Sequence, residues 1–349
     1  MRHAAATRAL ALATAALAAA GCGGAAAPPH ARTTQPTTPN AQAAELARPA
    51  LSPPLSRRPA GGVIHVGALP DAVAADPGTH RFAVAIHDPS RLALVDARSG
   101  RVLQRVAVPV GNATRGHRPV TPAVFLVPGE FGKRAVAVTP ATHTAPDAAE
   151  PAATVVFGRT FIVDARAGRV DALDRGRPVA HLAGVVRPAG LASGDFERTL
   201  AVVDAGRRAL SLYDPRSLRR VATVPAGAGP TNVVAEGDLL YVADTRGDAL
   251  LTFTTRPRLR LIERLALPGG APYGLAIDPV RRRLHITLTA TNTLVTIATD
   301  GSRTPARRRA TVRQPDAVAV DSSTATIAVA GRSAGVLQLI SPAARRRGG

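Results

Sequence analysis

The sequence predicts an all-β protein, a β-propeller, from a long-period repeat, from the residues inside each repeat and from the scarcity of helical patterning. A proline followed by a short apolar strand recurs through the second half of the chain at Pro188, Pro230, Pro272 and Pro315. The gaps are 42, 42 and 43 residues (230−188, 272−230 and 315−272). A fixed period in the forties is typical of repeat architectures, and four short strands per period indicate a propeller blade.

Each repeat fits one template of four strands. The first strand follows the proline and holds small residues, as in Val233-Val234-Ala235, because the innermost strands of a propeller converge on a narrow axis. The second strand, as in Leu239 to Ala243, is richer in branched residues. Short runs of Val, Ile and Thr bounded by Gly, Pro, Asp and Asn are strands joined by hairpins. No long stretch after the N-terminal segment has the apolar period of a helix.

The number of blades follows from the turn after the third strand. Between Asp96 and Asp174 this turn is missing over 78 residues (174−96), about twice the usual period. We therefore expect seven blades, with an irregular one between Asn112 and Glu150. Its outer hairpin is predicted at Val124 to Val127 with Ala135 to Val138. Six blades with a large insertion is the alternative.

Two further segments complete this architecture. The strand Gly62 to Gly67 precedes the first full blade, and we expect it to close the ring by pairing with the last blade. The stretch Thr139 to Pro151 is rich in Pro, Ala and Thr and predicts a loop that projects from the irregular blade. The propeller is thus expected over residues 62–342, before a basic tail at 343–349.

One repeat carries a family resemblance. Leu240-Tyr241-Val242-Ala243-Asp244-Thr245, followed by Asp248-Ala249-Leu250-Leu251-Thr252-Phe253, resembles the YVTN-type β-propeller repeat of bacterial proteins. The stretch from Phe82 through Asp96 to Gly111 matches the same pattern, and the resemblance covers roughly residues 63–342. It implies a seven-bladed fold in proteins that are often exported. These proteins range from surface proteins to lactonase-like enzymes, so the resemblance implies no single activity. A WD40 repeat is not expected, because its signature tryptophan is missing from a chain with no Trp.

The N-terminus predicts export and a lipid anchor. Arg2 and Arg8 precede an apolar stretch from Ala9 to Ala20, and small residues lead to Cys22, the only cysteine. This pattern indicates a secretory signal peptide over residues 1–21, too short to span a bilayer as a helix. Cys22 stands where a bacterial lipoprotein signal has its lipidated thiol. We therefore expect palmitate-type lipidation and anchoring on the extracytoplasmic side of the membrane. Cleavage by the ordinary signal peptidase near the same place is the alternative.

Residues 22–61 predict a disordered tether. Between Gly23 and Gly61 the chain is mainly Ala, Pro, Thr and Ser, and it includes Pro28-Pro29 and Pro53-Pro54. Such a composition buries too little apolar surface to fold alone. We expect the tether to hold the propeller away from the membrane, within the cell envelope.

The formal net charge of +20 raises the question of a polyanionic partner. Nucleic acid is excluded because aromatic residues make up 3 % of the chain and give no platform for stacking bases, and because an exported protein rarely meets DNA. Three arginine runs lie in predicted turns or in the tail, where a solvated charge run is the plain interpretation. Their functional interpretation is attraction to anionic lipid headgroups or acidic envelope polymers. These runs are Arg281-Arg282-Arg283, Arg307-Arg308-Arg309 and Arg345-Arg346-Arg347.

No catalytic or metal-binding motif is convincing. Gly331 to Gly335 spells G-x-S-x-G, but that motif needs a following helix and a later histidine, whereas strands flank it here and the last histidine is His285. The histidines have no metal-ligand spacing, and no second cysteine is available. The repeated Asp-Ala-Arg-x-Gly at Asp96 and Asp164 is interpreted as turn chemistry. We expect no metal and no other cofactor.

One constellation is a candidate ligand-binding site. The residues just after the repeat prolines share one structural phase and are expected to surround one mouth of the central channel. They include Asp71, Asn232, Tyr273 and Asp316. In a closed ring the last blade neighbours the first, which places Asp316 beside Asp71. Two such carboxylates can bind a cation or an amine, or act as an acid/base pair. The alternative is that each caps its own loop by accepting backbone N–H groups.

Two functions from different classes follow. The leading hypothesis is an envelope lipoprotein that displays the propeller as a non-catalytic binding or scaffolding module. Its expected partners are the membrane, through the lipid anchor, and acidic envelope polymers or another envelope protein, with a monomer favoured. The alternative is a lactonase-like or other hydrolase at the channel mouth, with Asp71 and Asp316 as acid/base groups or metal ligands.

Overall fold

The structure is a computed structural model of the 349-residue chain. It describes residues 44–88, 90–107, 123–129, 132–138, 152–164, 167–174, 177–194, 198–301 and 305–342. The expected signal peptide, Cys22, the projecting loop at 139–151 and the basic tail lie outside these residues.

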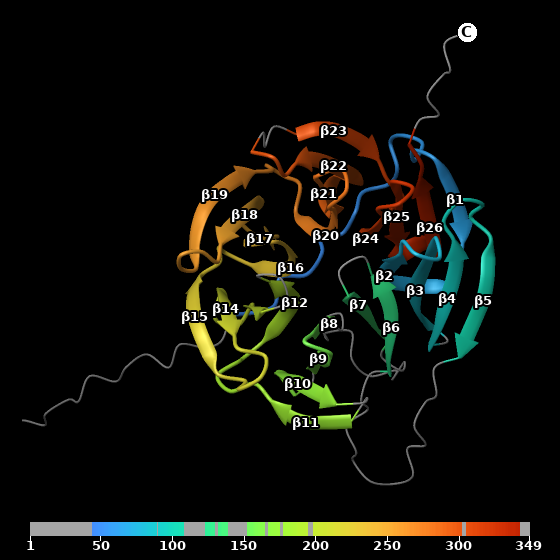
Figure 1. Ribbon diagram of the computed structural model, residues 1–349. Helices are drawn as coiled ribbons and strands as arrows, with labels where there is room; N and C mark the ends of the chain where they lie inside the picture. The colour runs from blue at the N-terminus through green and yellow to red at the C-terminus, as the bar shows by residue number, and fades with distance from the viewer. Residues whose placement is uncertain are drawn as a thin grey trace, which may run out of the picture. The chain divides into compact units, whose positions relative to one another are not determined.

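The chain forms an all-β propeller in which six four-stranded antiparallel sheets are arranged in a ring (Figure 1). The first sheet consists of β2 (Ala68–Asp76), β3 (Arg81–Asp88), β4 (Ser90–Asp96) and β5 (Val102–Ala107). The second consists of β8 (Ala153–Val156), β9 (Arg159–Asp164), β10 (Arg169–Asp174) and β11 (Arg177–His181). The third consists of β12 (Pro188–Gly194), β13 (Thr199–Asp204), β14 (Ala209–Tyr213) and β15 (Arg220–Pro225).

The other three sheets follow the same pattern. The fourth consists of β16 (Pro230–Glu236), β17 (Leu239–Asp244), β18 (Ala249–Thr254) and β19 (Arg260–Ala266). The fifth consists of β20 (Pro272–Asp278), β21 (Arg283–Leu288), β22 (Thr293–Ala298) and β23 (Pro305–Ala310), with the 3₁₀ turn η1 (Thr289–Thr291) before β22. The sixth consists of β24 (Pro315–Asp321), β25 (Thr326–Gly331) and β26 (Val336–Ile340), with η2 (Arg332–Ala334) before β26, and β1 (Gly62–His65) as its outer strand.

The predicted closure of the ring is confirmed. Strand β1 pairs antiparallel with β26, and Gly62 lies opposite Leu339 while His65 lies opposite Val336. The last sheet is therefore built from both ends of the propeller sequence, which covers an edge of β26 that would otherwise be open to pairing with another chain. Buried Val, Ile, Leu and Ala side chains fill the space between neighbouring sheets. One such cluster joins Phe82 and Val84 of the first sheet to Ala328 and Leu337 of the last.

The expectation of seven blades is wrong, because the described residues form six four-stranded sheets and one two-stranded sheet. The predicted hairpin is present as β6 (Ala123–Gly129) and β7 (Gly132–Val138), but it is a sheet of two strands. It contacts β2 and β3 on one side and β8 on the other, so it lies beside inner strands and is not the outer half of a full blade. The doubled interval in the sequence thus corresponds to an insertion that carries one hairpin.

The end of the expected tether is also corrected. Residues 44–53, here called the strap, cross one face of the ring and appear in blue in Figure 1. The amide of Ala44 donates to the carbonyl oxygen of Gly206 at 2.9 Å, and Arg246 donates to that of Leu46 at 3.2 Å. The amide of Ser52 donates to Gln314 at 3.1 Å. Leu46 also packs against a core cluster of the third and fourth blades. The strap is otherwise held by backbone hydrogen bonds, a mode of attachment that composition does not reveal.

Candidate functional site

A bulge follows the repeat proline at the start of five inner strands. The pairing register shifts between Pro188 and Gly190, between Pro230 and Val233, and at the matching positions of β2, β20 and β24. A β-bulge frees the extra residue from the ladder and turns its side chain in a new direction. The residues inside these bulges are Asp71, Ala189, Thr231 with Asn232, Tyr273 with Gly274, and Asp316. They include the four candidate residues, Asp71, Asn232, Tyr273 and Asp316, that the sequence predicts at the channel mouth.

The bulges bring the four predicted site residues into one row of neighbouring strands. Asn232 donates from its side-chain amide to the carbonyl oxygen of Tyr273 at 3.1 Å. Next to Tyr273, a Cβ placed on Gly274 would lie 2.9 Å from the carbonyl oxygen of Asp316. Strands β24 and β2 are neighbours, which brings Asp316 close to Asp71. The order around the ring is therefore the expected one.

Asp316 is 1 % exposed and is held by two side chains from nearby turns. Gln314 donates to its Oδ1 at 2.9 Å, and a guanidinium nitrogen of Arg332 lies 3.9 Å from its Oδ2. Burial raises the pKa of Asp316 to about 6, with the nearby charge of Asp71 adding to the rise, while Gln314 and Arg332 act in the opposite direction. At neutral pH this carboxyl group takes up a proton far more readily than an ordinary aspartate.

Asp71 is equally buried, at 2 % exposure, and its Oδ2 contacts Nε2 of His87 from β3. Oδ1 of Asp71 and Oδ2 of Asp316 are buried without a hydrogen-bond donor among the described residues. The donors that do reach the two groups are side chains, so the interpretation as caps of their own loops does not describe them. Two adjoining carboxylates with unfilled lone pairs can share a proton.

The strap is linked to Asp316, one member of this row, through the side chain of Gln314. Gln314 is the central link, because its side-chain amide donates both to Asp316 and to the carbonyl oxygen of Ala50, each at 2.9 Å. Its Oε1 accepts from the amide of Ser52, whose hydroxyl donates to the carbonyl oxygen of Thr289 at 2.6 Å. The four candidate residues thus lie on neighbouring strands, and Asp316 is linked through Gln314 to a segment of the same chain.

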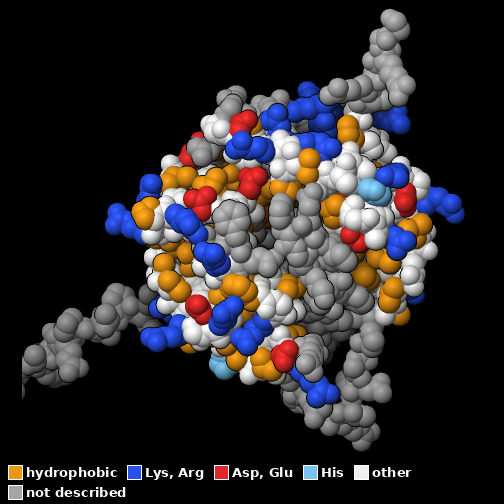
Figure 2. All heavy atoms as spheres, viewed as in Figure 1, with side chains coloured by type: hydrophobic (Ala, Val, Ile, Leu, Met, Phe, Trp, Pro, Cys, Tyr) orange, Lys and Arg blue, Asp and Glu red, His pale blue; other side chains and the backbone are white. Residues whose placement is uncertain are grey.

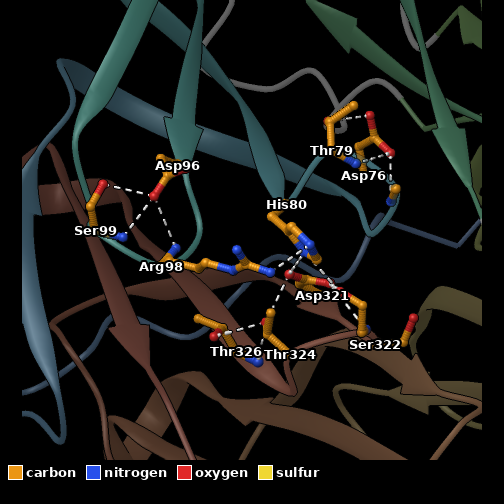
Figure 3. Close-up of polar contacts among 12 residues, drawn as sticks. Asp76, Thr79, His80, Asp96, Arg98, Ser99, Asp321, Ser322, Thr324 and Thr326 are labelled. Atoms are coloured by element: carbon orange, nitrogen blue, oxygen red, sulfur yellow. Dashed lines mark hydrogen bonds and ion pairs between the residues drawn. The ribbon is translucent and has the colours of Figure 1, made fainter.

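A second polar cluster, which the sequence did not indicate, lies where the turns of the first and last blades meet (Figure 3). His80 comes from the β2–β3 turn, and its Nδ1 lies 3.2 Å from Oδ2 of Asp321 and 2.8 Å from the hydroxyl of Ser323. Its Nε2 lies 2.8 Å from a guanidinium nitrogen of Arg98. His80 and Asp321 are 241 residues apart in the sequence, and only ring closure brings them together.

This Ser, His and Asp set is not arranged as a catalytic triad. In a triad the imidazole uses one nitrogen for the carboxylate and the other for the serine. Here both Asp321 and Ser323 lie at Nδ1, and the serine hydroxyl also donates to Oδ1 of Asp321 at 2.5 Å. Arg98 can only donate, so Nε2 of His80 accepts and Nδ1–H donates. The cluster is a clamp between the first and last blades.

The repeated aspartates behave as turn residues, as expected. Asp96 accepts from the amides of Arg98 and Ser99, and Asp164 accepts from the amide of Ala167. The G-x-S-x-G segment is a turn between β25 and β26. Within the described part of the chain, no group of three or more His, Cys, Asp or Glu side chains is placed to hold a metal ion. The same residues include no helix with the length and apolarity needed to cross a bilayer.

Comparisons with known proteins identify the fold. No family model matches the sequence, and no curated protein is similar enough to count as a relative. A solved streptogramin B lyase is similar at a TM-score of 0.60 and 14 % identity, over 82 % of this chain and 96 % of that one. Virginiamycin B lyase from Staphylococcus aureus is similar at a TM-score of 0.58 and 12 % identity, over 80 % of this chain and 99 % of that one. A chain of the mitotic checkpoint complex is similar at a TM-score of 0.61 and 16 % identity, over 85 % of this chain and 99 % of that one. At these identities, the shared property is the β-propeller fold.

Proposed function

We propose that this chain is an exported lipoprotein of the cell envelope that presents a β-propeller as a non-catalytic binding module. The observation that carries the proposal is the state of the channel mouth. A substrate site is normally an open concave pocket with a few converging polar groups. Here the carboxylates that would serve such a site are 1–2 % exposed, and Gln314, which donates to Asp316, also donates to the strap.

The proposed ligand is an acidic envelope polymer. The chain has a formal net charge of +20, and its basic residues are almost all arginines. A strongly cationic surface attracts polyanions over distances of about a Debye length, and the attraction weakens as salt increases. Co-sedimentation of the purified chain with isolated cell-wall polymer should therefore fall steeply between roughly 50 and 300 mM NaCl. Binding that is absent at low salt would contradict this ligand class.

Anchoring through Cys22 is tested by replacing the thiol. Intact mass after detergent extraction should exceed that of the polypeptide from Cys22 onward by at least a diacylglyceryl group. Cys22→Ser should release the protein from the membrane fraction, whereas Ala25→Ser, three residues later, should leave it bound. A Cys22→Ser protein that stays in the membrane fraction would exclude the lipid anchor.

A second candidate function, hydrolysis at the channel mouth, is favoured by one observation. Burial raises the pKa of Asp316 to about 6, next to Asp71, which suits a group that exchanges protons near neutral pH. Such a site would work only after the strap has moved away. Under our proposal, a panel of lactones at pH 6 shows no turnover above buffer. Turnover that is lost in Asp316→Asn would favour the enzyme instead.

A further inference from the structure

A cavity of about 340 Å³ lies between the end of the expected tether and the fifth blade. Ser56 and Arg57 line one side, and Thr291, Arg308, Arg309 and Thr311 line the other. The size is at the lower end of the range for small-molecule sites. Figure 2 shows basic side chains gathered over β23, the strand that contains Arg308 and Arg309.

The charge of the lining is one-sided. The lining includes three arginines, Arg57, Arg308 and Arg309, and no Asp or Glu. Arg309 is half-buried, and burial together with the charge of Arg307 lowers its pKa. Positive groups that are brought together and partly removed from water repel one another unless an anion lies between them. The lining therefore has an excess of positive charge that a negative ligand would offset.

An independent observation is the hydroxyl group of Thr311. Thr311 is 0 % exposed, and its Oγ1 has no hydrogen-bond partner among the described residues. Buried hydroxyl groups are nearly always paired, and an unpaired one calls for an explanation. Because Thr311 is one of the lining residues, a ligand oxygen in the cavity is a candidate for the missing partner.

We propose that this cavity binds a phosphate monoester, and this assignment deepens the proposed function by naming the chemistry of its anionic ligand. A phosphate group has a charge of about −2 and three acceptor oxygens, whereas a carboxylate has one charge and two oxygens. Three guanidinium groups and a buried hydroxyl group match the phosphate better. Guanidinium groups also bind phosphate in a bidentate manner. Because Arg57 comes from the segment just after the strap, the site is complete only when that segment is docked on the ring.

The first test measures binding of glycerol 3-phosphate to the purified full chain by calorimetry at low salt. Arg308→Gln and Arg309→Gln should each weaken binding by about ten- to hundred-fold, the usual effect of losing a hydrogen bond to a charged group. Arg307→Gln is the matched control, because Arg307 is exposed on the same strand and does not line the cavity. Equal losses in all three variants would mean a diffuse charge effect and would overturn the site.

The second test uses the orphan hydroxyl group. Thr311→Val should raise the melting temperature without ligand and weaken glycerol 3-phosphate binding. Thr299→Val is the control, because the hydroxyl group of Thr299 is also buried without a partner among the described residues, at 7 % exposure, but lies outside the lining. It should raise the melting temperature and leave binding unchanged. Unchanged binding in Thr311→Val would overturn the role of this group.

The source of the phosphate is separated by a third measurement. Inorganic phosphate and vesicles of phosphatidic acid, whose headgroup is a phosphate monoester, replace glycerol 3-phosphate in the same assay. Binding of glycerol 3-phosphate or inorganic phosphate that depends on Arg308 and Arg309 supports the pocket. Vesicle binding with the same dependence identifies a lipid headgroup as the source of the phosphate. Vesicle binding alone, with equal losses in Arg307→Gln, would overturn the pocket. All three measurements use soluble protein, so their failure is distinct from failure of the lipid anchor.

Discussion

At the scale of single residues, the position of an aspartate decides whether it is satisfied by the backbone or by side chains. Asp204, at the end of β13, accepts from the amides of Val186, Arg187 and Arg207. Asp244 accepts from the amides of Ala228, Gly229 and Gly247 in the same way. These groups fix the loop that enters the next inner strand. Asp71 and Asp316 lie inside bulges instead, where their contacts come from side chains.

Asp316→Asn should change how stability depends on pH. The pKa of Asp316 is about 6 when folded and 3.8 as the ordinary value, because burial disfavours the charge. The folded state therefore binds more protons between these values, and the wild-type free energy of unfolding falls as pH rises through this range, by roughly 2–3 kcal/mol. Asn lacks this titration, so the variant should lose this decline and gain relative stability at pH 7. Urea unfolding from pH 4 to 7.5 measures the free energy of unfolding of both proteins. Parallel curves of that free energy against pH would contradict the prediction.

Asp321→Asn should have the opposite effect on the free energy of unfolding near pH 7, lowering it. Burial alone would raise the pKa of Asp321, but hydrogen bonds from Ser323, Thr324 and His80 outweigh it and lower the pKa. The stabilisation is therefore present above the ordinary value of 3.8 and is lost as pH falls through the lower folded value. At pH 7 the variant should unfold about 1–3 kcal/mol more easily, as for lost hydrogen bonds to a charged group. The difference should shrink near pH 3, and a loss independent of pH would contradict the clamp.

At the scale of elements, the strap and β1 are the two N-terminal segments that bind to blades far away in sequence. The strap reaches the third blade at Gly206 and the sixth at Gln314, while β1 completes the sixth. Both add a cross-link that a repeat protein otherwise lacks, since each blade contacts mainly its neighbours.

Ser52→Ala should loosen the strap without unfolding the ring. The substitution removes the hydrogen bond from the serine hydroxyl to the carbonyl oxygen of Thr289 and the bond that the amide of Gln314 donates to it, at 2.6 and 3.1 Å. Local stability should fall by about 1–2 kcal/mol. Hydrogen exchange in residues 44–53 should accelerate, while Ser56→Ala, at an exposed position, should leave exchange unchanged. Acceleration throughout the ring would show a structural role beyond the strap.

At the scale of the whole molecule, ring closure depends on a strand that comes from before the first blade. Removing residues 1–66 exposes an edge of β26, which is open to pairing with other chains. We expect this truncation to aggregate or to melt well below the full chain in a thermal melt with light scattering. Removing residues 1–43 keeps the strap and β1 and should leave the melting temperature close to that of the full chain. A soluble monomer without residues 1–66 that melts as the full chain does would contradict the role of β1.

The repeat made the ring, its inner strands and the closing strand predictable, because a fixed spacing of prolines places each bulge in the same phase. The same phase is enough to place Asp316 beside Asp71. The blade number was not predictable, because a doubled interval is equally consistent with a full blade and with an inserted hairpin. The strap was missed because it is bound through backbone groups and through small side chains such as Ala47 and Ser52. The clamp of His80 and Asp321 needs ring closure to bring its members together, so no local pattern could reveal it.

The strap behaves as an intramolecular ligand of the propeller. A segment joined to its site by a short connection is present there at an effective concentration in the millimolar range, whatever the concentration of the protein. Any free molecule that binds the backbone and side-chain amide groups around Gln314 competes with the strap. A monovalent ligand at micromolar levels is at a disadvantage in that competition. A polymer that engages many sites at once has an effective concentration of its own, and it is the kind of ligand best able to displace the strap.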